Sequence, residues 1–128
     1  MIVKKTVEIE VAFEGGPKIV EQPRGTFRGG VPEPAVGADF GFNVLPEVEE
    51  PDGARGPVAD AAGYAGDLQI NLWGTTHDFR ELGRYLLAIA ELDTGVDPGF
   101  HQHHDEVISA DGRTRLHIIV RKIQPQAA

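Results

Sequence analysis

The sequence predicts a small α+β domain in which one main α-helix packs on one face of an antiparallel or mixed β-sheet. Three observations lead to this class: strand-like alternation near both ends of the chain, one stretch of helical periodicity between them, and a length of 128 residues with 41% hydrophobic content, which suits one packed core. We expect a single domain over residues 1–128. It comprises a loop-rich elaboration over 15–66 and a strand-helix-strand-strand core over 67–123.

The first expected element is a half-buried strand over Thr6–Phe13, because apolar and other residues alternate there without a break. Residues 15–66 hold most of the 16 glycines and most of the 9 prolines. This composition predicts a long, irregular Gly/Pro-rich segment, in which only Ala38–Leu45 has the pattern of a strand. Alternation returns over Asp67–Trp73, and its apolar members are Leu68, Ile70 and Leu72.

A helix is expected from about Thr76 to Leu92. Thr75 and Asp78 have the spacing of a capping box at its start. Gly95 is expected to end it in a left-handed conformation. The residues that we expect to pack on the sheet lie at helical spacing, and they are Phe79, Leu82, Leu86 and Ile89, with Tyr85 and Leu92 beside them.

The residues that follow the helix predict a β-hairpin. Its strands are expected within Phe100–Ser109 and Leu116–Ile123, and Asp111-Gly112 between them is a strong hairpin-turn signal, because both residues tolerate positive φ. With this hairpin, the elements of the core follow the order strand, helix, strand, strand.

Composition narrows the function classes. The chain has no cysteine and a net charge of −8, and it shows neither an apolar signal core nor a basic stripe, so we expect a cytoplasmic protein that binds neither nucleic acid nor membrane. Its charge suits a basic protein partner. The oligomeric state stays open. The side chains that we select for partner binding are an acidic run expected on an exposed loop, one aromatic residue and one histidine, namely Glu47, Glu49, Glu50, Asp52, Trp73 and His104.

A cluster of histidines offers an alternative function. On a strand, His101, His103 and Asp105 share one face, and His117 lies across the predicted hairpin. Two imidazoles and a carboxylate are ligands for zinc, iron or manganese. The other interpretation is that these are exposed polar residues with no cofactor. His77 is expected to be merely exposed in the first helical turn.

Residues 66–123 resemble the type-32 immunity proteins of bacterial polymorphic-toxin systems. The resemblance lies in the order of parts: the strand Asp67–Trp73, a Gly-Thr-Thr turn, the helix Asp78–Glu91, the histidine-bearing strand Phe100–Asp105 and the closing apolar strand Leu116–Ile123. It implies a small α+β protein that neutralises a cognate toxin by direct contact, without catalysis. We therefore expect an immunity-type inhibitor that is not an enzyme, and the alternative is a small histidine-dependent metal-binding protein or metalloenzyme.

Overall fold

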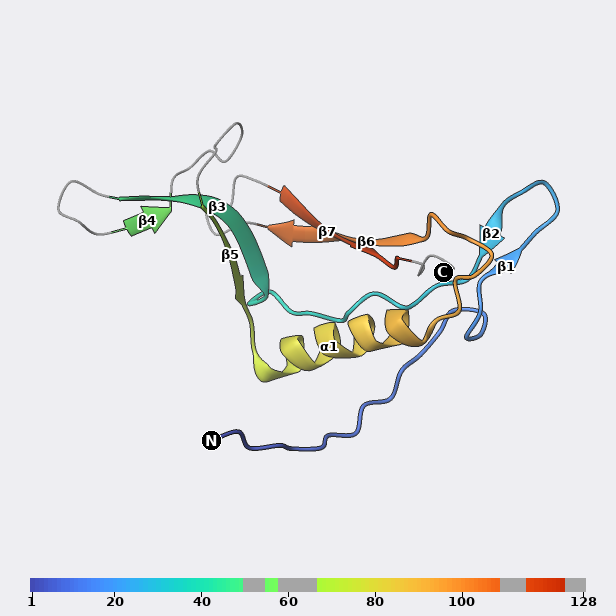
Figure 1. Ribbon diagram of the computed structural model, residues 1–128, viewed down its shortest axis with the longest axis horizontal. Coiled ribbons are helices and arrows are strands. Elements are labelled where there is room, and N and C mark those ends of the chain that lie inside the picture. Colours follow the sequence, from blue (N-terminus) through green and yellow to red (C-terminus); the bar gives the residue numbers. More distant parts are fainter. Residues whose placement is uncertain (50–54, 58–66, 109–114, 124–128) are drawn as a thin grey trace.

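The computed structural model describes residues 1–49, 55–57, 67–108 and 115–123. Within these ranges it contains one α-helix and seven strands, which confirms the α+β class (Figure 1). The elements are β1 (Val20–Glu21), β2 (Phe27–Arg28), β3 (Gly41–Glu49), β4 (Arg55–Pro57), β5 (Leu68–Trp73), α1 (Thr76–Glu91), β6 (His101–Ile108) and β7 (Arg115–Arg121).

The strands form three small antiparallel sheets where one sheet was expected. β1 pairs with β2, β6 pairs with β7, and a third sheet has the order β4-β3-β5. The β6–β7 hairpin is confirmed, although its turn lies outside the described residues. In Figure 1, the hairpin extends above α1, while β5 leads down into the first turn of the helix. Among the described residues, no helix has the length and apolar character needed to cross a membrane.

The start of α1 follows the sequence closely. The Thr75 side chain accepts a hydrogen bond from the Asp78 backbone N–H, and the Asp78 side chain accepts one from the Thr75 backbone N–H. This reciprocal capping box satisfies two backbone donors that a helix start otherwise leaves unpaired.

The end of α1 differs from the expectation. The backbone turns extended at Leu92, and Gly95 does not adopt a left-handed conformation. Instead, the chain enters a parallel bridge: Asp93 donates its N–H to the Pro17 carbonyl, and Ile19 donates its N–H to the Asp93 carbonyl. A contact with a distant segment, and not a local glycine motif, therefore ends the helix.

The buried face of α1 is rotated from the predicted one. Phe79 and Leu86 are 46% and 44% exposed, so their expected packing on the sheet is wrong. The helix side of the main core consists of Tyr85, Ala88, Ile89 and Leu92, which pack with Ile19, Val31 and Phe100. A second cluster forms around Phe40 and Phe42, and Leu82 of α1 packs against both clusters.

The predicted strand over Thr6–Phe13 is also wrong. These residues form no strand, although the half-buried side chains of Val11 and Phe13 do pack against the main core. Farther along, β3 begins three residues later than Ala38 and continues to Glu49. Backbone pairing with neighbouring chain is what defines a strand, and the N-terminal segment has none.

Candidate functional site

A proline-containing segment, Val31–Gly37, lies between α1 and β6, and we call it the strap. Pro32 and Pro34 have no N–H groups and do not suit regular strand pairing. Side chains therefore hold the strap. Gln102 of β6 accepts the Val31 N–H at 3.0 Å and donates its amide to the Val31 carbonyl.

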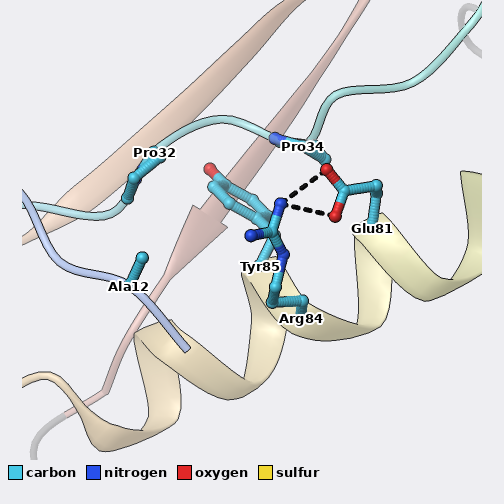
Figure 2. Close-up of a pocket in the computed structure, with 6 residues that line it drawn as sticks. All are labelled: Ala12, Pro32, Pro34, Glu81, Arg84 and Tyr85. Atoms are coloured by element: carbon cyan, nitrogen blue, oxygen red, sulfur yellow. Dashed lines mark hydrogen bonds and ion pairs between the residues drawn. The ribbon is translucent and has the colours of Figure 1, made fainter. Parts of the chain in front are cut away.

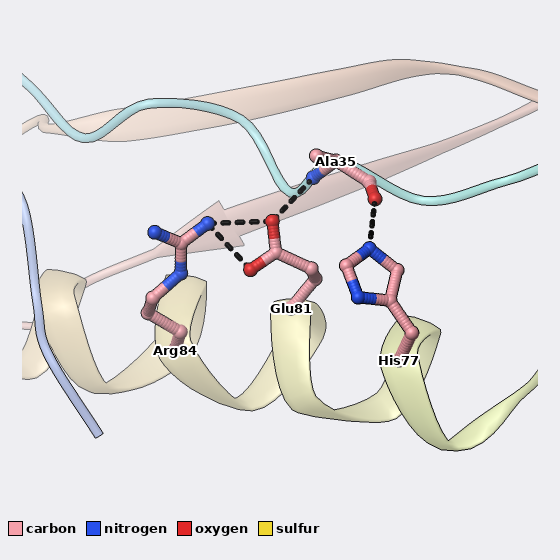
Figure 3. A network of polar contacts seen from close by, with 4 residues as sticks. All are labelled: Ala35, His77, Glu81 and Arg84. Carbon is pink, nitrogen blue, oxygen red and sulfur yellow. Dashed lines mark hydrogen bonds and ion pairs between the residues drawn. The ribbon is translucent and has the colours of Figure 1, made fainter.

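α1 holds the other end of the strap (Figure 3). The Ala35 N–H donates to Glu81 Oε1 at 3.2 Å, and His77 Nε2 donates to the Ala35 carbonyl at 3.1 Å. His77 is thus exposed as expected, but it also anchors the strap. Glu81 makes an ion pair with Arg84 one turn farther on.

Asp78 joins the strap to the helix cap. This carboxylate is only 1% exposed, and it accepts the Gly37 N–H and the Thr75 N–H, both at 2.9 Å. The hydrogen bond from Gly37 and then that from Thr75 lower the pKa of Asp78 from its usual value of 3.8, because both stabilise the charged form.

The crevice between the strap and α1 is narrow (Figure 2). Its lining is Ala12, Pro32, Pro34, Glu81, Arg84 and Tyr85, and its volume is about 10 Å³. That space holds about one water molecule. The crevice is therefore a packing seam between the strap, the N-terminal segment and the helix.

A larger hollow of about 420 Å³ also lies against the strap. It is lined by residues 33–37 of the strap, by Phe40 and by His104. His104 Nδ1 lies 3.4 Å from Glu33 Oε1, and its Nε2 is buried without a hydrogen-bond partner among the described residues. His104 is 7% exposed. Such burial does not fit its predicted role in partner binding, because a docking side chain must reach the surface.

His101 and His103 share the exposed face of β6, as the alternation predicts. Their rings meet edge to face with centroids 5.0 Å apart, and His101 Nδ1 donates to the Gly99 carbonyl at 3.0 Å. His117 of β7 is exposed as well, while the Asp105 side chain lies outside the described part. No set of three His, Cys, Asp or Glu residues suited to a metal ion occurs within the described ranges. The metal-binding alternative stays a prediction, because the side chain of one of its four candidate ligands, Asp105, is not described.

β5 presents an uncovered apolar face, which we call the β5 stripe. Its members are Leu68, Ile70 and Leu72, which are 55%, 67% and 45% exposed. Ile70 lies opposite Val44 of β3, and Leu72 lies opposite Phe42. Directly opposed residues share a face, so the stripe continues the apolar face that is buried at Phe42.

This face is covered on one side only. Phe42 is 7% exposed and belongs to the second core cluster, against which Ile118 of β7 packs. Contacts between β3 and β6 place the hairpin beside β3. The buried part of the face therefore lies on β3, and the part on β5 is left open.

The opposite face of β5 is polar. Gln69 donates to Asn71, and Asn71 donates to Asn43 of β3 at 2.8 Å. The half-buried Trp73 covers Gly41, whose position leaves no room for a side chain. Trp73, selected from the sequence for partner binding, thus packs on its own sheet.

The acidic run is not the loop that the sequence predicted. Glu47 and Glu49 lie in β3, where they pair with Pro57 and Arg55 of β4. Glu50 and Asp52 lie outside the described residues. The prediction of an exposed acidic loop is thus wrong for the backbone of Glu47 and Glu49.

Sequence reasoning identified the alternation of β5 but not the openness of its apolar side, because a covered and an uncovered amphipathic strand have the same pattern. Comparisons of this chain with protein-family models, curated proteins and solved structures found no match.

Proposed function

We propose that this protein is a protein-binding module and that the β5 stripe docks a partner protein. The observation that carries this proposal is the exposure of Leu68, Ile70 and Leu72 on one face of one strand. Branched apolar side chains gathered in the open on a protein surface commonly mark an interaction site.

Charge indicates the chemistry of the partner. The chain has a net charge of −8, so a basic protein is attracted over long distances while like-charged proteins are repelled. A partner with an apolar patch inside a basic rim would match both properties. We infer that apolar burial supplies the affinity and that charge speeds the encounter.

We further propose that the partner is a toxin, which makes this an immunity-type inhibitor. The strand-helix-strand-strand order over residues 66–123 and the acidic charge support this narrower proposal. Inhibition of this kind needs tight contact and no catalytic group.

The test compares two variants on opposite faces of β5. Ile70→Asp places a charge in the stripe, whereas Gln69→Asp places the same charge on the polar face one residue away. Each is used as bait in a cell extract, and the captured partner is then purified and titrated by calorimetry. We expect Ile70→Asp to weaken binding by roughly a hundredfold or more, as for loss of a central interface residue, and Gln69→Asp to change it by less than about threefold.

Equal affinity of Ile70→Asp and the unaltered protein would contradict the docking surface. The toxin proposal is tested separately by expressing the purified partner's gene in a growth assay. Growth inhibition that the unaltered protein relieves and Ile70→Asp does not is the expected result. A partner without any toxicity would leave the binding module intact and reject the immunity role.

A further inference from the structure

Residues 3–11 have the sequence of a strand but no strand partner. We propose that this segment pairs antiparallel with the same segment of a second copy of the chain and forms a homodimer. The proposal does not involve the β5 stripe, so it stands or falls independently of the proposed function.

The N-terminal segment leaves its backbone unpaired. No hydrogen bond joins any of residues 1–13 to the described part of the chain, and the first ordered backbone contact is the Glu14 N–H to the Gly30 carbonyl. Figure 1 draws the segment as an open trace that belongs to no sheet. Val3 and Val7 are 77% and 56% exposed. An alternating apolar segment with free backbone groups is a ready template for strand pairing.

One register makes the segment complementary to itself. When Val7 lies opposite Val7 of the second copy, Val3 lies opposite Val11 on the same face. Lys5 lies opposite Ile9 on this face, where its aliphatic stem packs on the apolar side chain while its ammonium group reaches water. Val11 already packs against the main core, so the Val3 side chain of the second copy extends that apolar contact. Cross-strand pairs of this kind are the unit of sheet stability.

Charge supports the same register on the other face. Lys4 lies opposite Glu10, and the two-fold symmetry repeats this pair. Thr6 lies opposite Glu8 without a charge conflict. All these side chains are exposed in the single chain, so they are available for pairing.

The neighbouring registers are less favourable. A shift of two residues in one direction places Glu8 opposite Glu8, and a further shift places Glu8 opposite Glu10. Like charges directly opposed destabilise a strand pair. A shift in the other direction keeps an attractive pair, Lys4 opposite Glu8, but it places Ile2 opposite Glu10. It also moves Val3 of the second copy away from Val11, so the added contact at the main core is lost.

Cysteine cross-linking tests the register, since the native chain has no cysteine. Val7→Cys should form a disulfide between two copies under mild oxidation, because opposed residues of antiparallel strands lie about 4.5–5.5 Å apart between Cα atoms. Ile9→Cys is the matched control. In this register its two copies are four residues apart along the strands, or roughly 13 Å, which is too far for a disulfide.

Light scattering after size-exclusion chromatography measures the molar mass of the protein and so tests the Lys4–Glu10 pairs. We expect a concentration-dependent dimer for the unaltered protein and dissociation roughly tenfold easier for Lys4→Glu, because two attractive pairs become repulsive. The double variant Lys4→Glu/Glu10→Lys should restore the dimer. A chain that is monomeric at every concentration, an unrestored double variant, or cross-linking of Ile9→Cys as efficient as that of Val7→Cys would each overturn the proposal.

Discussion

Truncating Ile89 to alanine tests which face of α1 is buried. Ile89 is 3% exposed and belongs to the main core, whereas Leu86 on the same helix is 44% exposed. Ile89→Ala removes three buried carbon groups at about 0.8 kcal/mol each, and the cavity left behind adds to that transfer term. We therefore expect a loss of about 2–5 kcal/mol in the free energy of unfolding.

Leu86→Ala is the matched control, because it also removes three carbon groups from α1. About half of that side chain is already in water, so the expected loss is roughly 1 kcal/mol. Urea unfolding followed by far-UV circular dichroism measures the loss of stability in both variants. The unfolding midpoints can be compared directly as long as the dependence of the unfolding free energy on urea is the same for the two. Equal losses for the two variants, or a larger loss for Leu86→Ala, would refute this placement of the helix.

Three further predictions concern other parts of the fold. Gly83→Ala should stabilise the protein by about 0.5–1 kcal/mol, because nothing lies within 4 Å of the added Cβ and alanine favours a helix. Gly41→Ala should cost about 1–3 kcal/mol, because its Cβ would lie 2.5 Å from an indole carbon of Trp73 in β5. Thermal unfolding of the two variants measures both changes. The lowered pKa of Asp78 means that its charged form stabilises the fold at neutral pH and that this contribution is lost as the pH falls below 3.8 toward the folded-state pKa. Acid titration of the urea midpoint should therefore show a smaller decline for Asp78→Asn than for the unaltered protein. Adding zinc or manganese should leave the melting temperature unchanged, and one bound metal per chain that is lost in a His101→Ala/His103→Ala variant would contradict this expectation.

Local signals in the sequence predicted the start of the helix, the hairpin and one strand of the three-stranded sheet. The capping box at Thr75 sets the start of α1, and β6 and β7 pair antiparallel as the predicted hairpin requires. β5 lies within one residue of its predicted bounds. The capping box and the hairpin depend on residues close in sequence. β5 was identified from its own alternation, although the strand that it pairs with, β3, is distant in sequence.

Features set by distant contacts could not be predicted. Periodicity correctly placed Tyr85, Ile89 and Leu92 on the packing side of α1. It did not show that Ala88, in place of Phe79 and Leu86, completes the buried face, because that depends on the contact with the distant Ile19 and Val31. The burial of His104 beside Glu33 depends on contacts 71 residues apart in sequence.

In the candidate site, too, local patterns were predicted and distant contacts were not. Alternation correctly placed His101 and His103 on one face of β6, and it grouped the members of the β5 stripe. Whether an apolar face is covered depends on where the hairpin packs, and no local pattern in β5 carries that information.

Hydroxyl-radical footprinting of the free protein and of its complex tests the central claim most directly. We predict that Leu68, Ile70 and Leu72 are oxidised readily in the free protein, that core residues such as Ile89 are not, and that the bound partner protects the three stripe residues. Oxidation of the stripe as slow as that of Ile89 in the free protein, or oxidation that the partner leaves unchanged, would contradict the claim that β5 presents an open docking surface.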